Sequence, residues 1–134
     1  DVINVAGHRL GTREIEESIS GHSSIAEVAV VGVADTLKGQ VALAFAVARN
    51  NDVAGDAAAC AALEKSVCNH VDAQLGAVAR PARVYFVSML PKTRSGKLLR
   101  RALQAVAEQR ETGDLSTMED PAALQQVVDA MGRG

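Results

Sequence analysis

Aromatic side chains are almost missing from this sequence of 134 residues, at 2% of the total. Nucleic-acid bases would therefore find no stacking platform, and a pI near 5.9 lacks the basic excess of most nucleic-acid-binding domains. Long apolar runs are missing as well, since none approaches the ~18 residues that a membrane span needs. We therefore expect neither nucleic acid nor a membrane among the partners of this protein.

Cysteine is scarce too, and its two positions exclude a local disulfide. Cys60 and Cys68 fall in a helical pattern, and their separation corresponds to about 12 Å of helix rise, whereas a disulfide needs Cα atoms within about 7 Å. We expect two reduced thiols in the core of a cytoplasmic protein. The histidines show no metal-ligand spacing, so no metal site is predicted.

The composition that remains is typical of one globular domain. Apolar residues make up 48% of the chain and charged residues 22%, a balance that disordered chains do not have. The sequence begins Asp1-Val2-Ile3, without an initiator Met. We expect it to be part of a longer protein.

The hydrophobic pattern predicts an α+β fold: an N-terminal β-hairpin, a short, mostly three-stranded sheet and helices packed on it. Residues 2–5 and 8–10 flank Ala6-Gly7 as two strands flank a tight turn. The other expected elements, in chain order, are a helix over 12–20 capped by Thr12, strands over 25–33 and 41–47, a helix over 56–75, a strand over 84–87, a helix over 96–108 and a last helix from Pro121 to Met131.

The most informative stretch, residues 91–101, carries five of the 14 basic residues and no acid. A solvated basic face is the simplest interpretation, but the place of Lys97 favours a site. We expect Lys97 in the first turn of a helix, where a cation is unfavourable unless it helps the free backbone N–H groups to hold an anion. Gly96 would let a ligand approach the backbone closely. Pro91 and Leu98 stand where a Walker A loop requires other residues, so a phosphate or carboxylate contact outside that motif is predicted.

A second candidate site lies near the N-terminus, where Gly7 and Gly11 bracket His8 and Arg9. An ordinary turn would also explain this pattern.

Taken together, the two stretches resemble a known family. DVINVAGHR at residues 1–9 and PKTRSGK at residues 91–97 are similar to the C-terminal domain of AMP-forming acyl-CoA synthetases, within the branch that contains the acetyl- and propionyl-CoA synthetases. Ala6, Leu10, Arg13 and the stretch around 113–121 resemble the propionyl-CoA members more closely. The resemblance covers nearly the whole chain. It divides the chain into residues 1–111, the mobile C-terminal domain, and residues 112–134, a linker and a helix.

The resemblance implies a reaction in two steps. A carboxylate and ATP, which brings Mg²⁺ with it, form an acyl-adenylate and pyrophosphate; the domain then rotates, and the thiol of CoA attacks the adenylate. Lys97 is implied as the catalytic residue of the first step, contacting carboxylate and α-phosphate oxygens. Ala6, Gly7, His8 and Arg9 are implied to bind nucleotide or CoA in the second, with Gly7 lining the tunnel of the pantetheine.

The same resemblance implies partners. They are propionate and other short-chain carboxylates, the protein's own N-terminal domain, and an acyltransferase and a deacylase that act on Lys97. The chain alone should be nearly inactive, because the N-terminal domain would supply the ATP and acyl pockets. The alternative is a free-standing module whose basic loop binds phosphorylated or acidic partners.

Overall fold

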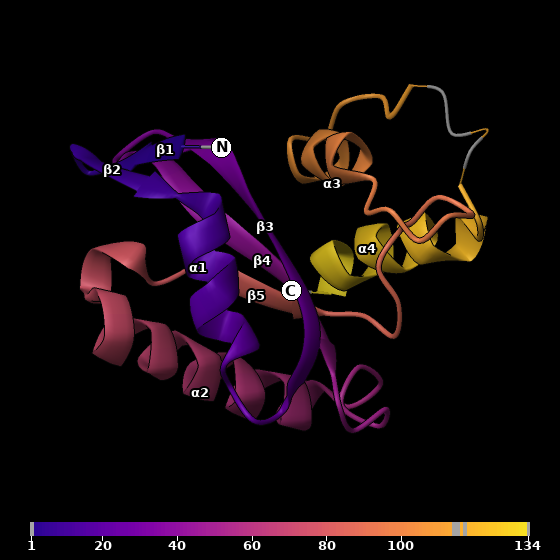
Figure 1. The fold of residues 1–134 in the computed structure, drawn as a ribbon, viewed down its shortest axis with the longest axis horizontal. Helices are drawn as coiled ribbons and strands as arrows, with labels where there is room; N and C mark the ends of the chain where they lie inside the picture. Colours follow the sequence, from indigo (N-terminus) through magenta and orange to yellow (C-terminus); the bar gives the residue numbers. More distant parts are fainter. Residues whose placement is uncertain (1, 114–115, 117, 134) are drawn as a thin grey trace.

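The computed structural model describes residues 2–113, 116 and 118–133, and its α+β fold confirms the class predicted from the sequence (Figure 1). The elements in chain order are β1 (Val2–Val5), β2 (His8–Gly11), α1 (Thr12–Ser20), β3 (Ile25–Asp35), β4 (Gly39–Ala48), α2 (Ala57–Leu75), a 3-10 turn (Ala77–Ala79), β5 (Arg83–Phe86), α3 (Arg100–Ala107) and α4 (Pro121–Arg133).

The long strand β4 organises the sheet. It pairs antiparallel with β3 over the full length of both strands and parallel with β5 through residues 43–46. The predicted hairpin of β1 and β2 is present, and the pair Val5–Gly39 joins it to β4. The three-stranded sheet expected from the sequence therefore extends to five strands, with β3 at one edge.

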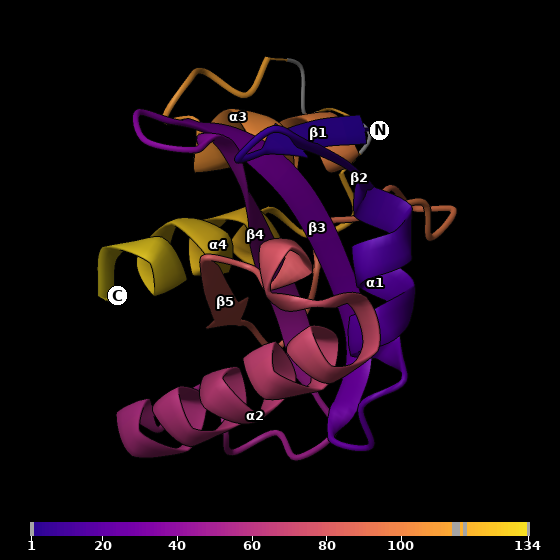
Figure 2. The same ribbon diagram turned by 90° about the vertical axis from the view of Figure 1, so that its left-hand side faces the viewer.

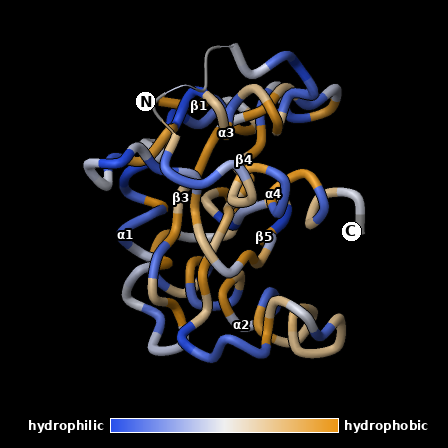
Figure 3. The backbone as a smooth tube through the Cα atoms, turned by 90° about the vertical axis from the view of Figure 1, so that its right-hand side faces the viewer, coloured by the Kyte–Doolittle hydropathy of each residue, from blue (hydrophilic) through white to orange (hydrophobic). Residues whose placement is uncertain are grey.

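Helices cover both faces of this sheet (Figure 2). Successive residues of a strand face opposite sides, and β4 follows this rule closely. Its alanines at 42, 44, 46 and 48 pack in the core beneath α1 and α2, whereas Leu43 and Phe45 pack in a second core with Leu103 of α3 and Val127 of α4. The hydrophobic colours accordingly concentrate on the central strands in Figure 3.

The starts of three helices can be compared with the sequence. The helix predicted over 56–75 begins at Ala57, and Asp56 caps it, since its carboxylate accepts hydrogen bonds from the backbone N–H groups of Ala58 and Ala59 at 3.0 and 3.2 Å. The prediction for Thr12 was wrong: Thr12 is the first residue of α1, and Gly11 occupies the cap position without a side-chain hydrogen bond. Pro121 begins α4, as predicted.

The C-terminal segment packs on the rest of the fold. Met118 is buried and forms a β-bridge with Thr93, and Val127 is fully buried. Residues 114, 115 and 117 of the predicted linker lie outside the described residues, and the division of the chain at residue 111 stays a prediction. No helix in the described part of the chain is long and apolar enough to cross a bilayer.

Candidate functional site

Residues 92–98, hereafter the basic loop, form a tight hairpin between β5 and α3. Lys92 and Leu98 pair as a β-bridge at its base. Within the loop, Thr93 N–H donates to the Lys97 carbonyl at 2.9 Å, Gly96 N–H donates to the Thr93 carbonyl at 2.9 Å, and Lys97 N–H donates to Thr93 Oγ1 at 3.2 Å. Gly96 has φ +87°, a left-handed conformation that favours glycine. The backbone near Lys97 is therefore well defined although it is neither helix nor extended strand.

The prediction of a helix over 96–108 was wrong about where the helix starts. The helix begins at Arg100, so Lys97 precedes it by three residues. The backbone groups of Thr93, Gly96 and Lys97 bond within the hairpin, and Leu99 N–H donates to the Pro91 carbonyl at 2.9 Å. These bonds leave no helical turn before Arg100, and the helix-dipole argument for Lys97 does not apply.

The cations of this stretch differ in whether they have a partner among the described residues. Lys92 is ion-paired with Glu27 of β3, and Arg100 with Glu16 of α1. Arg94 donates to the Ser116 carbonyl at 3.4 Å. Lys97 is exposed, and its ammonium makes no hydrogen bond or ion pair with the described residues.

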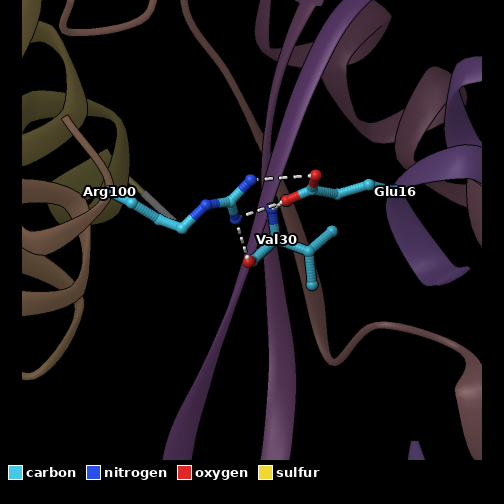
Figure 4. Close-up of polar contacts among 3 residues, drawn as sticks. All are labelled: Glu16, Val30 and Arg100. Atoms are coloured by element: carbon cyan, nitrogen blue, oxygen red, sulfur yellow. Dashed lines mark hydrogen bonds and ion pairs between the residues drawn. The ribbon is translucent and has the colours of Figure 1, made fainter. Parts of the chain in front are cut away.

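The Arg100 pair is the most extensive of these contacts (Figure 4). Arg100 Nη1 and Nη2 donate to Glu16 Oε2 and Oε1 at 2.6 and 3.1 Å, and Nη1 also donates to the Val30 carbonyl at 3.2 Å. Glu16 Oε2 accepts in addition from Val30 N–H at 2.7 Å. The hydrogen bond to Glu16 raises the pKa of Arg100 above its ordinary value. A bidentate pair of this kind fixes orientation as well as charge.

The predicted nucleotide- or CoA-binding residues form the turn between β1 and β2. Ala6 and Gly7 have φ +50° and +85°, the two positive values of a type I′ turn. Ala6, Gly7, His8 and Arg9 are all exposed. Apart from Gly7 and its two chain neighbours, no atom of the described chain lies within 4 Å of a Cβ built on Gly7, so the turn presents its side chains and Gly7 to solvent.

The turn and the basic loop lie apart. The β1–β2 end is at the left of Figure 1, and the loop between β5 and α3 extends to the right; Figure 2, turned by 90°, also separates them. The structure therefore does not bring Lys97 together with the Ala6–Arg9 turn.

The other candidate groups serve the fold. Cys60 Sγ donates to the Val53 carbonyl at 3.0 Å, Cys68 lies 3.7 Å from the Pro81 carbonyl, and burial raises the pKa of the Cys68 thiol. No disulfide joins the two cysteines. Among the described residues no group of three or more His, Cys, Asp or Glu side chains is placed to hold a metal ion.

Two features of this site were missed in the sequence. Neither Glu16 nor Glu27 was predicted from the sequence to contact the basic stretch. Each contacts a residue of the basic stretch that is more than 60 positions away. No local pattern signals such a pairing.

A comparison with known proteins now identifies the class. Residues 14–97 match the family model described as "AMP-binding enzyme C-terminal domain". This match covers more than half of the chain, and it includes Glu16 and Lys97. The chain belongs to this family, and the resemblance noted in the sequence is confirmed.

Individual relatives show which kinds of protein within this family the chain resembles. The chain is 60% identical to propionate–CoA ligase of Escherichia coli over 98% of its own length and 21% of that protein. It is 45% identical to acetyl-coenzyme A synthetase of Pyrobaculum aerophilum, over 94% of the chain and 18% of that protein. The crystal structure of Brucella canis acyl-CoA synthetase superposes with a TM-score of 0.62 at 35% identity, covering 73% of this chain and 17% of that one. The chain spans about a fifth of the length of the curated relatives it matches.

Proposed function

We propose that this chain is the C-terminal domain of an AMP-forming propionyl-CoA synthetase. The observation that carries the proposal is 60% identity to propionate–CoA ligase over 98% of the chain. In the whole enzyme, propionate or another short-chain carboxylate and ATP would give acyl-adenylate and pyrophosphate, and CoA would then give acyl-CoA and AMP. The ATP, its Mg²⁺ and the acyl group would be held mainly by the N-terminal domain.

Lys97 is the residue we assign to adenylation. Its ammonium is exposed and unpaired among the described residues, at the end of a hairpin whose backbone is hydrogen-bonded. A charge positioned in this way can stabilise the negative charge that develops on the carboxylate and α-phosphate oxygens. Because the ammonium has no partner among the described residues, no ion pair has to be broken before it meets these oxygens.

We assign the turn at Ala6, Gly7, His8 and Arg9 to the thioester step. The exposed guanidinium of Arg9 suits the phosphates of nucleotide or CoA, and Gly7 leaves open space beside the backbone. Since this turn lies apart from the basic loop, one active site would meet the two in succession only if the domain rotates. The separation supports a mechanism in which rotation changes the half-reaction.

Replacing Lys97 by Ala in the full-length enzyme tests this assignment. We expect adenylation, measured as pyrophosphate–ATP exchange with propionate, to fall by roughly 10²–10³ in kcat, as when one oxyanion donor is lost. Thioester formation from supplied propionyl-adenylate should stay within about twofold, because only the first step uses the ammonium.

The matched control is Arg101→Ala, which removes an exposed cation on the same segment. We expect this variant to keep both half-reactions, because Arg101 lies in α3 and not in the basic loop. Equal loss of both half-reactions in Lys97→Ala, or exchange at the normal rate, would contradict the assignment.

Acylation of Lys97 would regulate the same step. An acyl group removes the charge of the ammonium, so we propose a lysine acyltransferase and a deacylase as partners in the cytoplasm. The exposure of Lys97 makes its Nζ accessible to such enzymes. Mass spectrometry of the protein from its native cells, under conditions with and without excess propionate, would detect the modified lysine.

A further inference from the structure

We propose that Glu16 is a positioning residue for adenylation, which acts by holding Arg100 and thereby the backbone that carries Lys97. This inference rests on the assignment of Lys97 to adenylation. It concerns a carboxylate on α1, an element that lies outside the basic loop.

Glu16 connects three separate elements of the fold. Its carboxylate accepts from Val30 N–H of β3 and from both terminal nitrogens of Arg100, the first residue of α3. The Glu16 side chain is 15% exposed, so solvent screens the pair only in part. Glu16 therefore connects a helix on one face of the sheet, an edge strand and the start of a helix on the other face.

Arg100 lies close to Lys97 along the chain. Arg100 follows Lys97 by three residues, and Leu99 N–H is bonded to the Pro91 carbonyl on the other strand of the hairpin. A change in the position of Arg100 would therefore be transmitted to the whole basic loop. A displacement of about 1 Å at a reacting group can cost up to 10²-fold in rate.

The basic loop has a second attachment to the sheet. Lys92, on the opposite strand of the hairpin, is ion-paired with Glu27 of β3. Both ends of the loop are thus attached to β3 through carboxylates. Loss of Glu16 alone would loosen one end, so we expect partial loss of adenylation and not its abolition.

The fold contains a matched carboxylate at the opposite edge of the sheet. Glu64 of α2 accepts from Val84 N–H at 2.7 Å and from Arg83 Nε at 2.9 Å through its Oε2. It repeats the combination of a strand N–H and an arginine that Glu16 binds. Its partners belong to β5, so Glu64 separates a general effect on stability from an effect on Lys97.

The experiment compares Glu16→Gln with Glu64→Gln in the full-length enzyme. Glutamine keeps an oxygen for the strand N–H and removes the charge that holds the arginine. We expect both variants to lower the melting temperature to a similar extent. Only Glu16→Gln should lower kcat for pyrophosphate exchange, by roughly ten- to a hundredfold, with thioester formation from supplied propionyl-adenylate within about twofold.

Two further variants, Arg100→Lys and Lys97→Ala, complete the test. Arg100→Lys should reproduce the selective loss of exchange, because lysine cannot bind Glu16 through two nitrogens, and it replaces Glu16→Gln if that variant does not fold. Equal effects of Glu16→Gln and Glu64→Gln on exchange, or equal loss of both half-reactions in Glu16→Gln, would overturn the inference while Lys97→Ala still blocks adenylation. Normal exchange in Lys97→Ala would instead overturn the proposed function.

Discussion

At the scale of residues, charge alone does not separate the cation proposed to act in catalysis from those that stabilise the fold in the basic stretch. Lys92 and Arg100 are attached to carboxylates of the domain, whereas the Lys97 ammonium faces solvent. The sequence could show that five cations lie together, and the resemblance selected Lys97 from them. It could not show which cations have partners, because Glu16 and Arg100 are 84 residues apart.

The turn between β1 and β2 carries backbone strain at Ala6 that was not predicted from the sequence. Ala6 has φ +50°, a region in which a residue with a Cβ costs roughly 1–2 kcal/mol. Asn tolerates this region and is the preferred partner of Gly in a type I′ turn. We expect Ala6→Asn to raise the free energy of unfolding by about 0.5–1 kcal/mol, measured by urea denaturation of this chain.

The control for this prediction is the same substitution at an exposed helical alanine. Ala62→Asn in α2 should lower the free energy of unfolding by about 0.5 kcal/mol, because Asn is a poorer helix former. A loss of stability in both variants would show that the turn does not favour asparagine.

At the scale of elements, two helices on one face of the sheet supply carboxylates to its two opposite edges. Glu16 of α1 bonds to β3 and Glu64 of α2 bonds to β5. The sequence predicted both helices from their hydrophobic spacing, and Asp56 and Pro121 marked helix starts correctly. It failed at the start of α3, since the hydrogen bonds of residues 93–97 form a hairpin that helical periodicity does not reveal.

The junction of α1 and α2 contains a pH-sensitive contact. His22 Nε2 lies 2.8 Å from Ser66 Oγ, its Nδ1 accepts from Ser24 N–H at 3.1 Å, and its ring meets that of His70 at 5.4 Å. Burial, and then repulsion by His70, lower the pKa of His22 below its ordinary value. Folding therefore favours the neutral ring, so this stabilisation is complete above about pH 6.5 and is lost as the pH falls through the lowered pKa.

We expect His22→Gln to reduce the loss of stability between about pH 7.5 and pH 5.5, measured as the shift of the urea midpoint. His8→Gln, at an exposed site in the β1–β2 hairpin, should keep the shift of the unmodified chain. An unchanged shift in His22→Gln would assign the pH dependence to other groups.

At the scale of the whole molecule, two anion-binding candidates occupy separate parts of one small fold. The sequence predicted both of them, together with the α+β class, because each is a short contiguous motif. Their separation depends on the path of β4 and β5 through the sheet, which local motifs do not specify. The arrangement supports two orientations of the domain against one active site.

Gly7 tests the second orientation. We expect Gly7→Leu in the full-length enzyme to slow thioester formation at least about tenfold more than Gly7→Ala, because only the longer side chain would block the path of the thiol. Both variants share the strain at φ +85°, and a Cβ at this position meets no described atom beyond its chain neighbours, so their melting temperatures should be similar. Pyrophosphate exchange should persist in both, and its loss would contradict the assignment of the turn to the second step.

The contacts along β3 have one more consequence, for self-association. β3 is an edge strand of eleven residues, rich in valine, and such edges readily add a strand from another molecule. Here the Glu16 carboxylate accepts a hydrogen bond from Val30 N–H, and Arg100 donates one to the Val30 carbonyl. Gln104 donates a third to the Gly32 carbonyl at 2.6 Å. These side chains satisfy both backbone groups of Val30 and the carbonyl of Gly32, so the contacts that hold Arg100 also help to protect the edge from aggregation.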